Sequence, residues 1–150
     1  LIHPQSIVHS LVEYRDGSLI AQMGVPDMRV PIAYALSFPG RLRRRDTMLD
    51  LVKAGTLEFF APDPGRFPCL GLAYRAAETG GTMPAVLNGA NEIAVAAFLD
   101  GRIGFMDICR TIRGVMDRHE AVPDPAIDRI LEADRWARRE AEEMVKGTGN

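Results

Sequence analysis

The chain has 150 residues, of which 47% are hydrophobic and 25% charged, the balance of an ordinary globular protein with one domain or one domain and an extra element. Its formal net charge of -2 gives no reason to expect a nucleic-acid or anionic-membrane partner, and no apolar run approaches the ~20 residues that span a bilayer. Cys69 and Cys109 stand far apart and lack a C-x-x-C partner, which predicts two reduced, buried thiols in a cytoplasmic protein.

The first predicted element is a β-hairpin over residues 7–24. Its sequence alternates around Asp16-Gly17, a dipeptide that suits a two-residue type I′ turn because both turn positions need a positive φ. The predicted cross-strand pairs are Tyr14 with Leu19, Val12 with Ala21, and Ser10 with Met23. This register gives one apolar face and one mixed face with His9 and Gln22. An isolated hairpin is marginal in water, so we expect it to belong to a larger mixed sheet.

A short helix and a long connection are predicted next. Asp27 can cap a helix that has Pro31 in its first turn and ends at Pro39-Gly40. Residues 40–65 have weak periodicity and contain a Pro-Asp-Pro-Gly turn, so we interpret them as an extended connection with one helical turn near Leu49–Lys53.

From Phe67 onward the pattern indicates four amphipathic helices. The first has Pro68 near its start and Gly80-Gly81 at its end, and the second is Ala-rich, with Asn88 or Asn91 expected to cap its second half. The third helix has an apolar stripe of Phe105, Ile108, Ile112 and Val115. The fourth begins after Asp124-Pro125, and its expected apolar residues are Ile127, Ile130, Leu131, Trp136 and Met144. Short links between such helices favour an antiparallel bundle.

The predicted fold is therefore α+β: a β-hairpin from a larger mixed sheet, followed by a C-terminal antiparallel, four-helix-like bundle. We divide the chain into residues 1–39 (hairpin and short helix), a linker over residues 40–65, and a helical bundle domain over residues 66–150.

Few residues suggest chemistry by themselves. His3 and His9 lie six apart with no metal-ligand pattern, so ordinary hydrogen-bonded histidines are the favoured interpretation, although His9 could meet a partner strand, another subunit or a polar ligand. Met28 is expected to fill a gap in the core, or else to pack against a flat ligand ring. The segment NGANEIAVAAF is explained by helix capping and by close packing through Gly89 and Ala90.

A basic cluster is the one feature that could favour nucleic acid. It consists of Arg41, Arg43, Arg44 and Arg45, without interleaved aromatic residues, so we favour a solvated connector. The chain also has no Rossmann glycine motif, no P-loop, no catalytic triad spacing and no paired carboxylates on the hairpin. By itself it presents no complete reaction centre.

Three stretches together resemble one family. LIHPQSIVHSLVEYRDGSLIAQMGVPDMRVPIAYAL, LEFFAPDPGRFPCLGLA and LNGANEIAVAAFLDGRIGF are similar to the C-terminal part of 1-deoxy-D-xylulose 5-phosphate reductoisomerase, an enzyme of the non-mevalonate isoprenoid route. The resemblance covers nearly the whole chain, and it is weakest at GRLRRRDTM and KGTGN.

The resemblance implies a whole enzyme with an NADPH-binding domain, a central catalytic or connecting domain and a C-terminal helical bundle. That enzyme rearranges 1-deoxy-D-xylulose 5-phosphate and reduces the product to 2-C-methyl-D-erythritol 4-phosphate with NADPH, using Mg or Mn as a Lewis acid. It also implies a homodimer paired through the hairpin sheet. From the charge and the lack of a long apolar run, we expect no nucleic-acid partner and no membrane partner. The family's metal ligands and phosphate-binding residues precede the matched part, so we expect this fragment alone to be inactive and to bind no cofactor.

By the same resemblance three residues are expected at the site. Ser6 and His9 would support the catalytic centre, and Met28 would pack beside the nicotinamide ring, so it is the expected cofactor-binding residue. No catalytic residue and no metal ligand is assigned in this chain. The alternative function is a non-catalytic oligomerisation or interaction module of the same ancestry.

Overall fold

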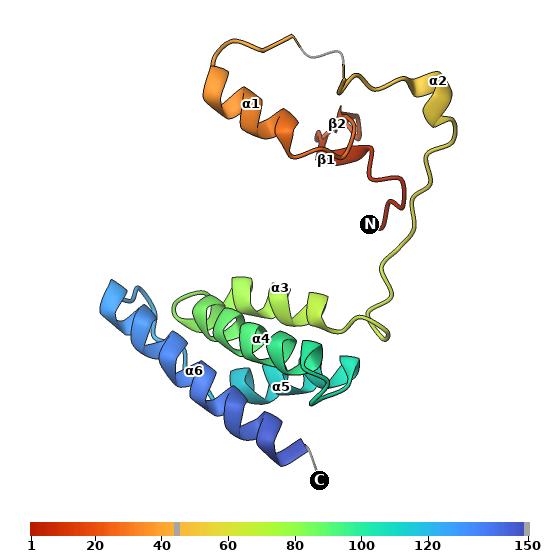
Figure 1. Cartoon of the computed structure of the whole chain (residues 1–150). Helices are drawn as coiled ribbons and strands as arrows, with labels where there is room; N and C mark the ends of the chain where they lie inside the picture. Colours follow the sequence, from red (N-terminus) through yellow and green to blue (C-terminus); the bar gives the residue numbers. More distant parts are fainter. Residues whose placement is uncertain (44–45, 149–150) are drawn as a thin grey trace. The chain divides into compact units, whose positions relative to one another are not determined.

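The computed structural model describes residues 1–43 and 46–148, and its contacts divide the chain into two compact units, Leu1–Pro62 and Asp63–Asn150. Among these described residues, the first unit contains an antiparallel two-stranded sheet and two short helices, and the second contains four helices (Figure 1). This order of elements confirms the predicted α+β class, with a hairpin followed by a helical bundle.

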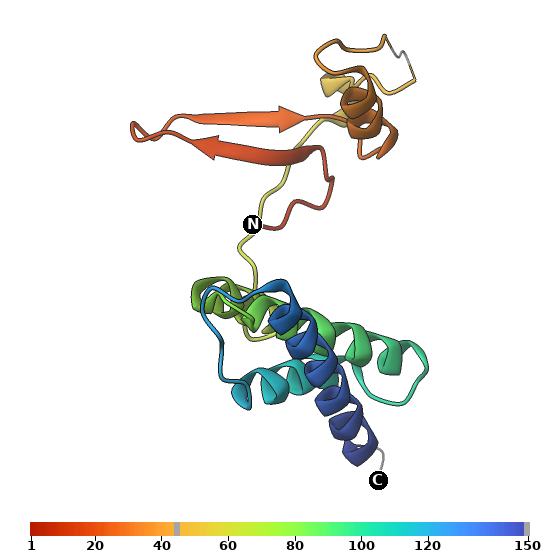
Figure 2. The ribbon, with the colours of Figure 1, turned by 90° about the vertical axis from the view of Figure 1, so that its left-hand side faces the viewer.

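The hairpin consists of strands β1 (Val8–Glu13) and β2 (Leu19–Met23), which run side by side in Figure 2. The predicted register is wrong by one residue, because Val12 pairs with Ile20 and Leu11 with Ala21. The loop is one residue longer than the predicted turn: Gly17 N–H donates to the Tyr14 carbonyl at 2.9 Å, and Tyr14 N–H donates to the Ser18 carbonyl at 2.9 Å. Within this loop only Gly17 has a positive φ, of 83°, whereas a type I′ turn needs a positive φ at both central residues, so the turn is not the predicted type I′.

The changed register alters both faces of the sheet. Because side chains alternate along a strand, a shift by one residue moves the side chains of β2 to the opposite face relative to β1. Leu19 now lies opposite Glu13, and Gln22 lies opposite Ser10. Polar residues therefore lie on both faces, and the predicted apolar face does not form. Within the described part of this unit, Ile7 is the only buried residue, with 8% of its surface exposed.

The two helices of this unit are short. α1 (Arg29–Ser37) begins one residue later than an Asp27 cap would place it, and the Asp27 carboxylate accepts the Arg29 N–H at 2.9 Å. α2 (Leu51–Ala54) is the predicted helical turn, and the Asp50 carboxylate caps it by accepting two backbone N–H groups.

The helices of the second unit are α3 (Cys69–Thr79), α4 (Met83–Leu99), α5 (Phe105–Asp117) and α6 (Ile127–Thr148). α3 starts after Pro68 and ends at Gly80 as predicted. The predicted cap within α4 is wrong: the helix is continuous, and the Asn88 side chain donates to the Glu92 carboxylate at 3.0 Å.

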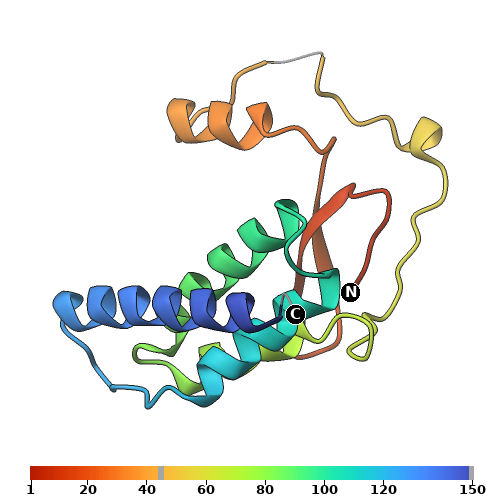
Figure 3. The ribbon, with the colours of Figure 1, turned by 60° about the horizontal axis from the view of Figure 1, so that its bottom comes forward.

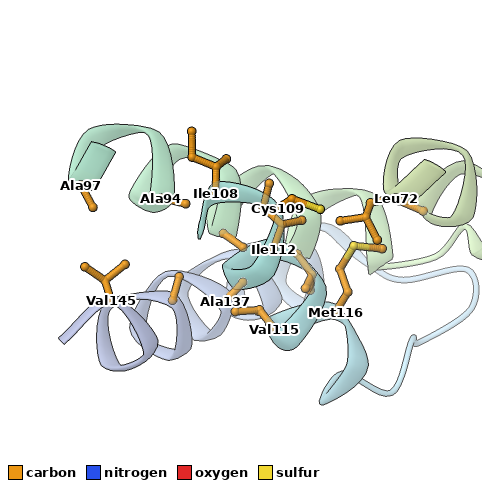
Figure 4. Packing of buried hydrophobic residues seen from close by; sticks show 14 of the residues in the cluster. Leu72, Ala94, Ala97, Ile108, Cys109, Ile112, Val115, Met116, Ala137 and Val145 are labelled. Atoms are coloured by element: carbon orange, nitrogen blue, oxygen red, sulfur yellow. The ribbon is translucent and has the colours of Figure 1, made fainter. Parts of the chain in front are cut away.

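Small residues line the contact between α4 and α6, which cross closely in Figure 3. On α4 the residues Gly89, Ala90 and Ala94 are buried, and a Cβ added to Gly89 would lie 3.1 Å from the Asp134 carbonyl oxygen and 3.4 Å from the Cβ of Ala137. α3 and α5 complete the core with larger side chains, including Leu72, Ile112 and Met116 (Figure 4). The backbones of α4 and α6 can approach because these contact side chains are short.

The predicted buried face of α6 is only partly right. Trp136 and Met144 pack against the core as predicted, although each is only partly buried. Ile127 and Leu131 are 72% and 48% exposed, and the buried face of α6 consists of Ala133, Ala137, Ala141 and Val145. A bulky stripe would hold α6 away from the small-residue surface of α4, whereas alanines at i, i+4 and i+8 fit against it. On α5, Ile108, Ile112 and Val115 are buried as predicted, but Phe105 is exposed and contacts Phe98 edge-on.

Within the described residues, no helix is both long enough and apolar enough to cross a membrane.

Candidate functional site

Ser6 lies in a tight turn directly before β1. Its N–H donates to the His3 carbonyl oxygen at 3.1 Å, and its φ is 49°, in the left-handed region that few non-glycine residues adopt. The side chain is exposed. Residues that a fold holds in this sparsely populated region are frequent at functional positions.

His9 occupies a β-bulge in β1. Val8 pairs with Met23 and Ser10 pairs with Gln22, which leaves His9 as the extra residue without a partner across the sheet. Bulges of this kind are frequent beside active sites because they redirect one side chain. The His9 side chain is exposed, and Gln22, which was expected beside it, lies opposite Ser10 instead.

Met28 is exposed rather than part of a core. Its surface is 72% exposed, and it is the N-cap residue of α1. The structure therefore excludes the gap-filling role within this unit and leaves the flexible thioether free to pack against a flat ring.

One backbone hydrogen bond joins the segments that contain these residues. The Gly24 N–H donates to the Ile7 carbonyl oxygen at 2.9 Å, which fastens the residue after Ser6 to the segment that leads to Met28. Between the side chains of Ser6, His9 and Met28 themselves the described contacts include no hydrogen bond. The hairpin base thus positions three separate exposed side chains and does not assemble them into a catalytic cluster.

Residues 2–5 are joined to residues 58–60, a contact that the sequence analysis missed. Ile2 and Phe60 form a reciprocal backbone pair at 2.8 and 2.9 Å. The Glu58 carboxylate accepts the Gln5 amide at 2.8 Å, and the Glu58 N–H donates to the Gln5 side-chain oxygen at 3.2 Å. We call residues 2–5 and 58–60 the N-terminal joint. No local pattern predicts such a pairing, because its two halves are more than fifty residues apart.

His3 lies at the centre of the N-terminal joint. Its Nδ1 lies 2.8 Å from the Glu58 carbonyl oxygen, and its ring stacks on Phe59 with centroids 4.6 Å apart. Because a carbonyl only accepts, Nδ1 must have the hydrogen, and the buried Nε2 has no hydrogen-bond partner among the described residues. The joint also places part of the predicted linker, residues 58–60, in the same compact unit as the hairpin.

The conspicuous NGANE segment forms part of an ion-pair network between α4 and α6. Arg138 contacts Glu92 at 2.7 Å and Asp134 at 2.8 Å. Hydrogen bonds from Arg138 and then from Asn88 lower the pKa of Glu92, while bonds to Asp134 and Glu92 raise the pKa of Arg138. Gly89 and Ala90 serve the close packing predicted for them. This network holds two helices together and presents no unpaired acid or base for catalysis.

A second cluster surrounds His119 at the end of α5. Its Nε2 lies 2.7 Å from the hydroxyl oxygen of Thr82, and its ring contacts Trp136 with centroids 5.2 Å apart. Burial lowers the pKa of His119, and the negative charge of Glu120 partly opposes this effect. A groove of about 410 Å³ beside this cluster is lined by Arg118, Arg129 and Glu132, among others.

The two cysteines are free thiols, Cys109 buried and Cys69 partly buried. Burial, together with the neighbouring Cys109 thiol, raises the pKa of Cys69 to about 11, so it is a weak nucleophile at neutral pH.

The basic cluster is described only in part. Arg41 lies over the Tyr34 ring at 4.3 Å, while Arg44 and Arg45 lie outside the described residues. In the described part of the chain no three His, Cys, Asp or Glu side chains are close enough to hold a metal ion, so these residues alone do not fit a magnesium or manganese site.

A family model described as the DXP reductoisomerase C-terminal domain matches residues 23–140. Relatives named 1-deoxy-D-xylulose 5-phosphate reductoisomerase include those of Acetivibrio thermocellus, 58% identical over 97% of the chain, and Citrifermentans bemidjiense, 60% identical over 96% of it. The chain belongs to the 1-deoxy-D-xylulose 5-phosphate reductoisomerase family.

Solved structures of the reductoisomerase family agree with this assignment. The enzyme from Zymomonas mobilis in complex with NADPH has a TM-score of 0.86 and 46% identity, covering 95% of this chain and 38% of its own. A reductoisomerase in complex with magnesium has a TM-score of 0.86 and 42% identity, covering 99% and 39%. The chain spans only 38% and 37% of the length of the two curated relatives named above and corresponds to the C-terminal part of reductoisomerases.

Proposed function

We propose that this chain forms the C-terminal part of an NADPH-dependent reductoisomerase that converts 1-deoxy-D-xylulose 5-phosphate into 2-C-methyl-D-erythritol 4-phosphate. The observation that carries this proposal is 58% identity to a reductoisomerase over 97% of the chain. Related reductoisomerase structures in complex with NADPH and with magnesium support these cofactors for the whole enzyme. A divalent metal would polarise the substrate oxygens when bound there.

Within that enzyme the exposed residues at the hairpin base have the expected roles. Ser6 and His9 support the substrate site by hydrogen bonding, and the thioether of Met28 packs beside the nicotinamide ring. The support for these roles is local: a left-handed Ser6, a His9 displaced by a bulge and a Met28 that is 72% exposed. Residues 1–39 belong in this view to the connecting domain, 40–65 to a linker and 66–150 to the helical bundle.

The hairpin also supports a homodimer, because its two faces retain exposed apolar side chains such as Leu11, Val12 and Ile20. A cytoplasmic location agrees with two free thiols. A non-catalytic interaction module of the same ancestry is the competing proposal, and it uses the same exposed hairpin.

A chimaera tests the proposal. The C-terminal 38% of the Acetivibrio thermocellus enzyme is replaced by this chain, and NADPH oxidation is followed with 1-deoxy-D-xylulose 5-phosphate and Mn or Mg. We expect turnover within about tenfold of the parent enzyme, and none from the 150-residue chain by itself. A folded but inactive chimaera would favour the interaction module, and turnover by the isolated chain would overturn its role as a part of the enzyme.

Single substitutions in the chimaera separate the expected roles. His9→Ala should lower kcat about tenfold or more, the usual contribution of one hydrogen-bonding group at a reaction centre. Met28→Ala should raise KM for NADPH several-fold and change kcat less, because it removes only packing against the cofactor. Unchanged turnover and unchanged NADPH affinity would remove either residue from the site. Lys53→Gln, an exposed position on α2, is the matched control.

A further inference from the structure

The turn at Ser6 lies between two fixed points of the chain. On one side the Ser6 N–H is bonded to the His3 carbonyl, and on the other the carbonyl of Ile7 accepts the Gly24 N–H. A serine holds a φ of 49° only when its surroundings enforce that conformation. On the N-terminal side of the turn, the residue that could hold this conformation is His3.

His3 is held by two contacts to the far half of the N-terminal joint. Nδ1–H donates to the Glu58 carbonyl oxygen at 2.8 Å, and the ring stacks on Phe59 with an interplanar angle of 16°. Since its buried Nε2 has no hydrogen-bond partner among the described residues, the Nδ1 bond is the polar interaction that fixes the orientation of the ring. The adjacent Ile2–Phe60 backbone pair and the Gln5–Glu58 side-chain pair close the same contact.

We propose that His3 is a positioning residue, which holds the Ser6 turn in its left-handed conformation through its Nδ1–H bond to the Glu58 carbonyl. The inference rests on the proposed function, because Ser6 matters to the reaction only if it supports the substrate site. His3 itself does not touch substrate or cofactor in this scheme. Its effect passes through the backbone of residues 3–6, since the His3 carbonyl is the acceptor for Ser6.

Two substitutions of His3 in the active chimaera separate the hydrogen bond from the stacking contact. His3→Phe keeps a flat ring against Phe59 and removes the donor, whereas His3→Asn keeps an amide donor near the position of Nδ1 and loses the ring. We expect His3→Phe to lower kcat about tenfold with unchanged KM for NADPH. His3→Asn should retain at least half of the parental kcat although it melts at a lower temperature than His3→Phe.

The proposal predicts that His3→Asn has the higher kcat and His3→Phe the higher melting temperature. A merely structural role predicts that activity follows melting temperature, with His3→Phe the more active variant. That result, or a His3→Phe enzyme with parental kcat, would overturn the proposal.

Hydrogen exchange at the Ser6 amide of the folded chimaera provides a readout that is independent of activity. His3→Phe should speed this exchange at least tenfold, and His3→Asn should change it less than threefold. If the unsubstituted chimaera is folded but inactive, the proposed function fails, while the exchange measurement still decides whether His3 fixes the turn. Equal exchange in all three proteins would exclude that role.

Discussion

His119 illustrates how the surroundings of one side chain set its chemistry. Its imidazole packs on Trp136 and pairs with Thr82, whose hydroxyl oxygen also accepts the Val122 N–H at 3.1 Å. Charged side chains border the same groove, but burial is the larger influence and lowers the pKa of His119. The folded protein therefore favours the neutral ring more strongly than the unfolded chain does.

This difference makes the stability of the helical unit depend on pH. A lowered folded-state pKa means that the unfolded chain binds the proton first, so the contribution of neutral His119 is complete above pH ~6.5 and is lost as the pH falls toward the folded value. We expect His119→Gln to reduce the slope of unfolding free energy against pH below that point. One proton limits the slope to about 1.4 kcal/mol per pH unit.

Urea denaturation at a series of pH values provides the measurement. Glu120→Gln is the companion variant, because it removes the charge that raises the pKa of His119 and should steepen the loss at low pH. Identical slopes in the wild-type protein and His119→Gln would contradict the expectation.

At the scale of elements, the turn between α3 and α4 depends on two adjacent glycines with different surroundings. Both have positive φ, 65° for Gly80 and 57° for Gly81. A Cβ on Gly80 would meet nothing within 4 Å, whereas a Cβ on Gly81 would lie 2.2 Å from the Val122 carbonyl oxygen. That carbonyl also accepts the Thr82 N–H, so it is held in place against the turn.

Alanine at these two positions should therefore have unequal effects. Gly80→Ala should cost about 2 kcal/mol, because Gly80 has a φ of 65° with a ψ of -153°, a backbone region that essentially only glycine adopts. Gly81→Ala adds a clash with backbone and should cost about 3 kcal/mol or more. Thermal and urea unfolding of the two variants measure the difference, and equal losses would show that the backbone at Val122 relaxes without cost.

At the scale of the whole molecule, the two compact units differ in how much apolar surface they bury. In the second unit the four helices share one core that includes Val86, Ala137 and Val115, all fully buried. In the described part of the first unit only Ile7 is buried. A sheet of two strands with no covered face is marginal in water, so the stability of the chain resides in the helical unit.

Residues 63–150 should accordingly fold when expressed alone. We expect a cooperative thermal transition by far-UV circular dichroism with a Tm close to that of the 150-residue chain. Residues 1–62 alone should show no cooperative transition and weak dispersion of amide resonances. A large loss of Tm in the 63–150 fragment would show that the first unit contributes stability beyond its buried area.

Local features of the sequence determined the elements and the family. Asp50, Pro68 and Gly80 mark helix ends through interactions within a few residues, and the alternation over residues 7–24 identifies a hairpin. The exposed, unusual surroundings of Ser6, His9 and Met28 were not predictable, because a resemblance places residues at a site without describing their backbone. The charge network of Glu92 and Arg138 was also missed, since it joins two helices.

Only the tertiary structure decided the register of the hairpin, the buried face of α6 and the contact of His3 with Glu58. A single loop residue sets the register, because Gly17 alone takes a positive φ in the hairpin loop. The buried face of α6 consists mainly of alanines because α4 packs closely against it at Gly89, where bulkier side chains would not fit. Hydrophobic periodicity describes one element at a time, so it does not resolve the backbone conformation of the loop, and the buried face of α6 and the His3–Glu58 contact depend on residues distant in the chain.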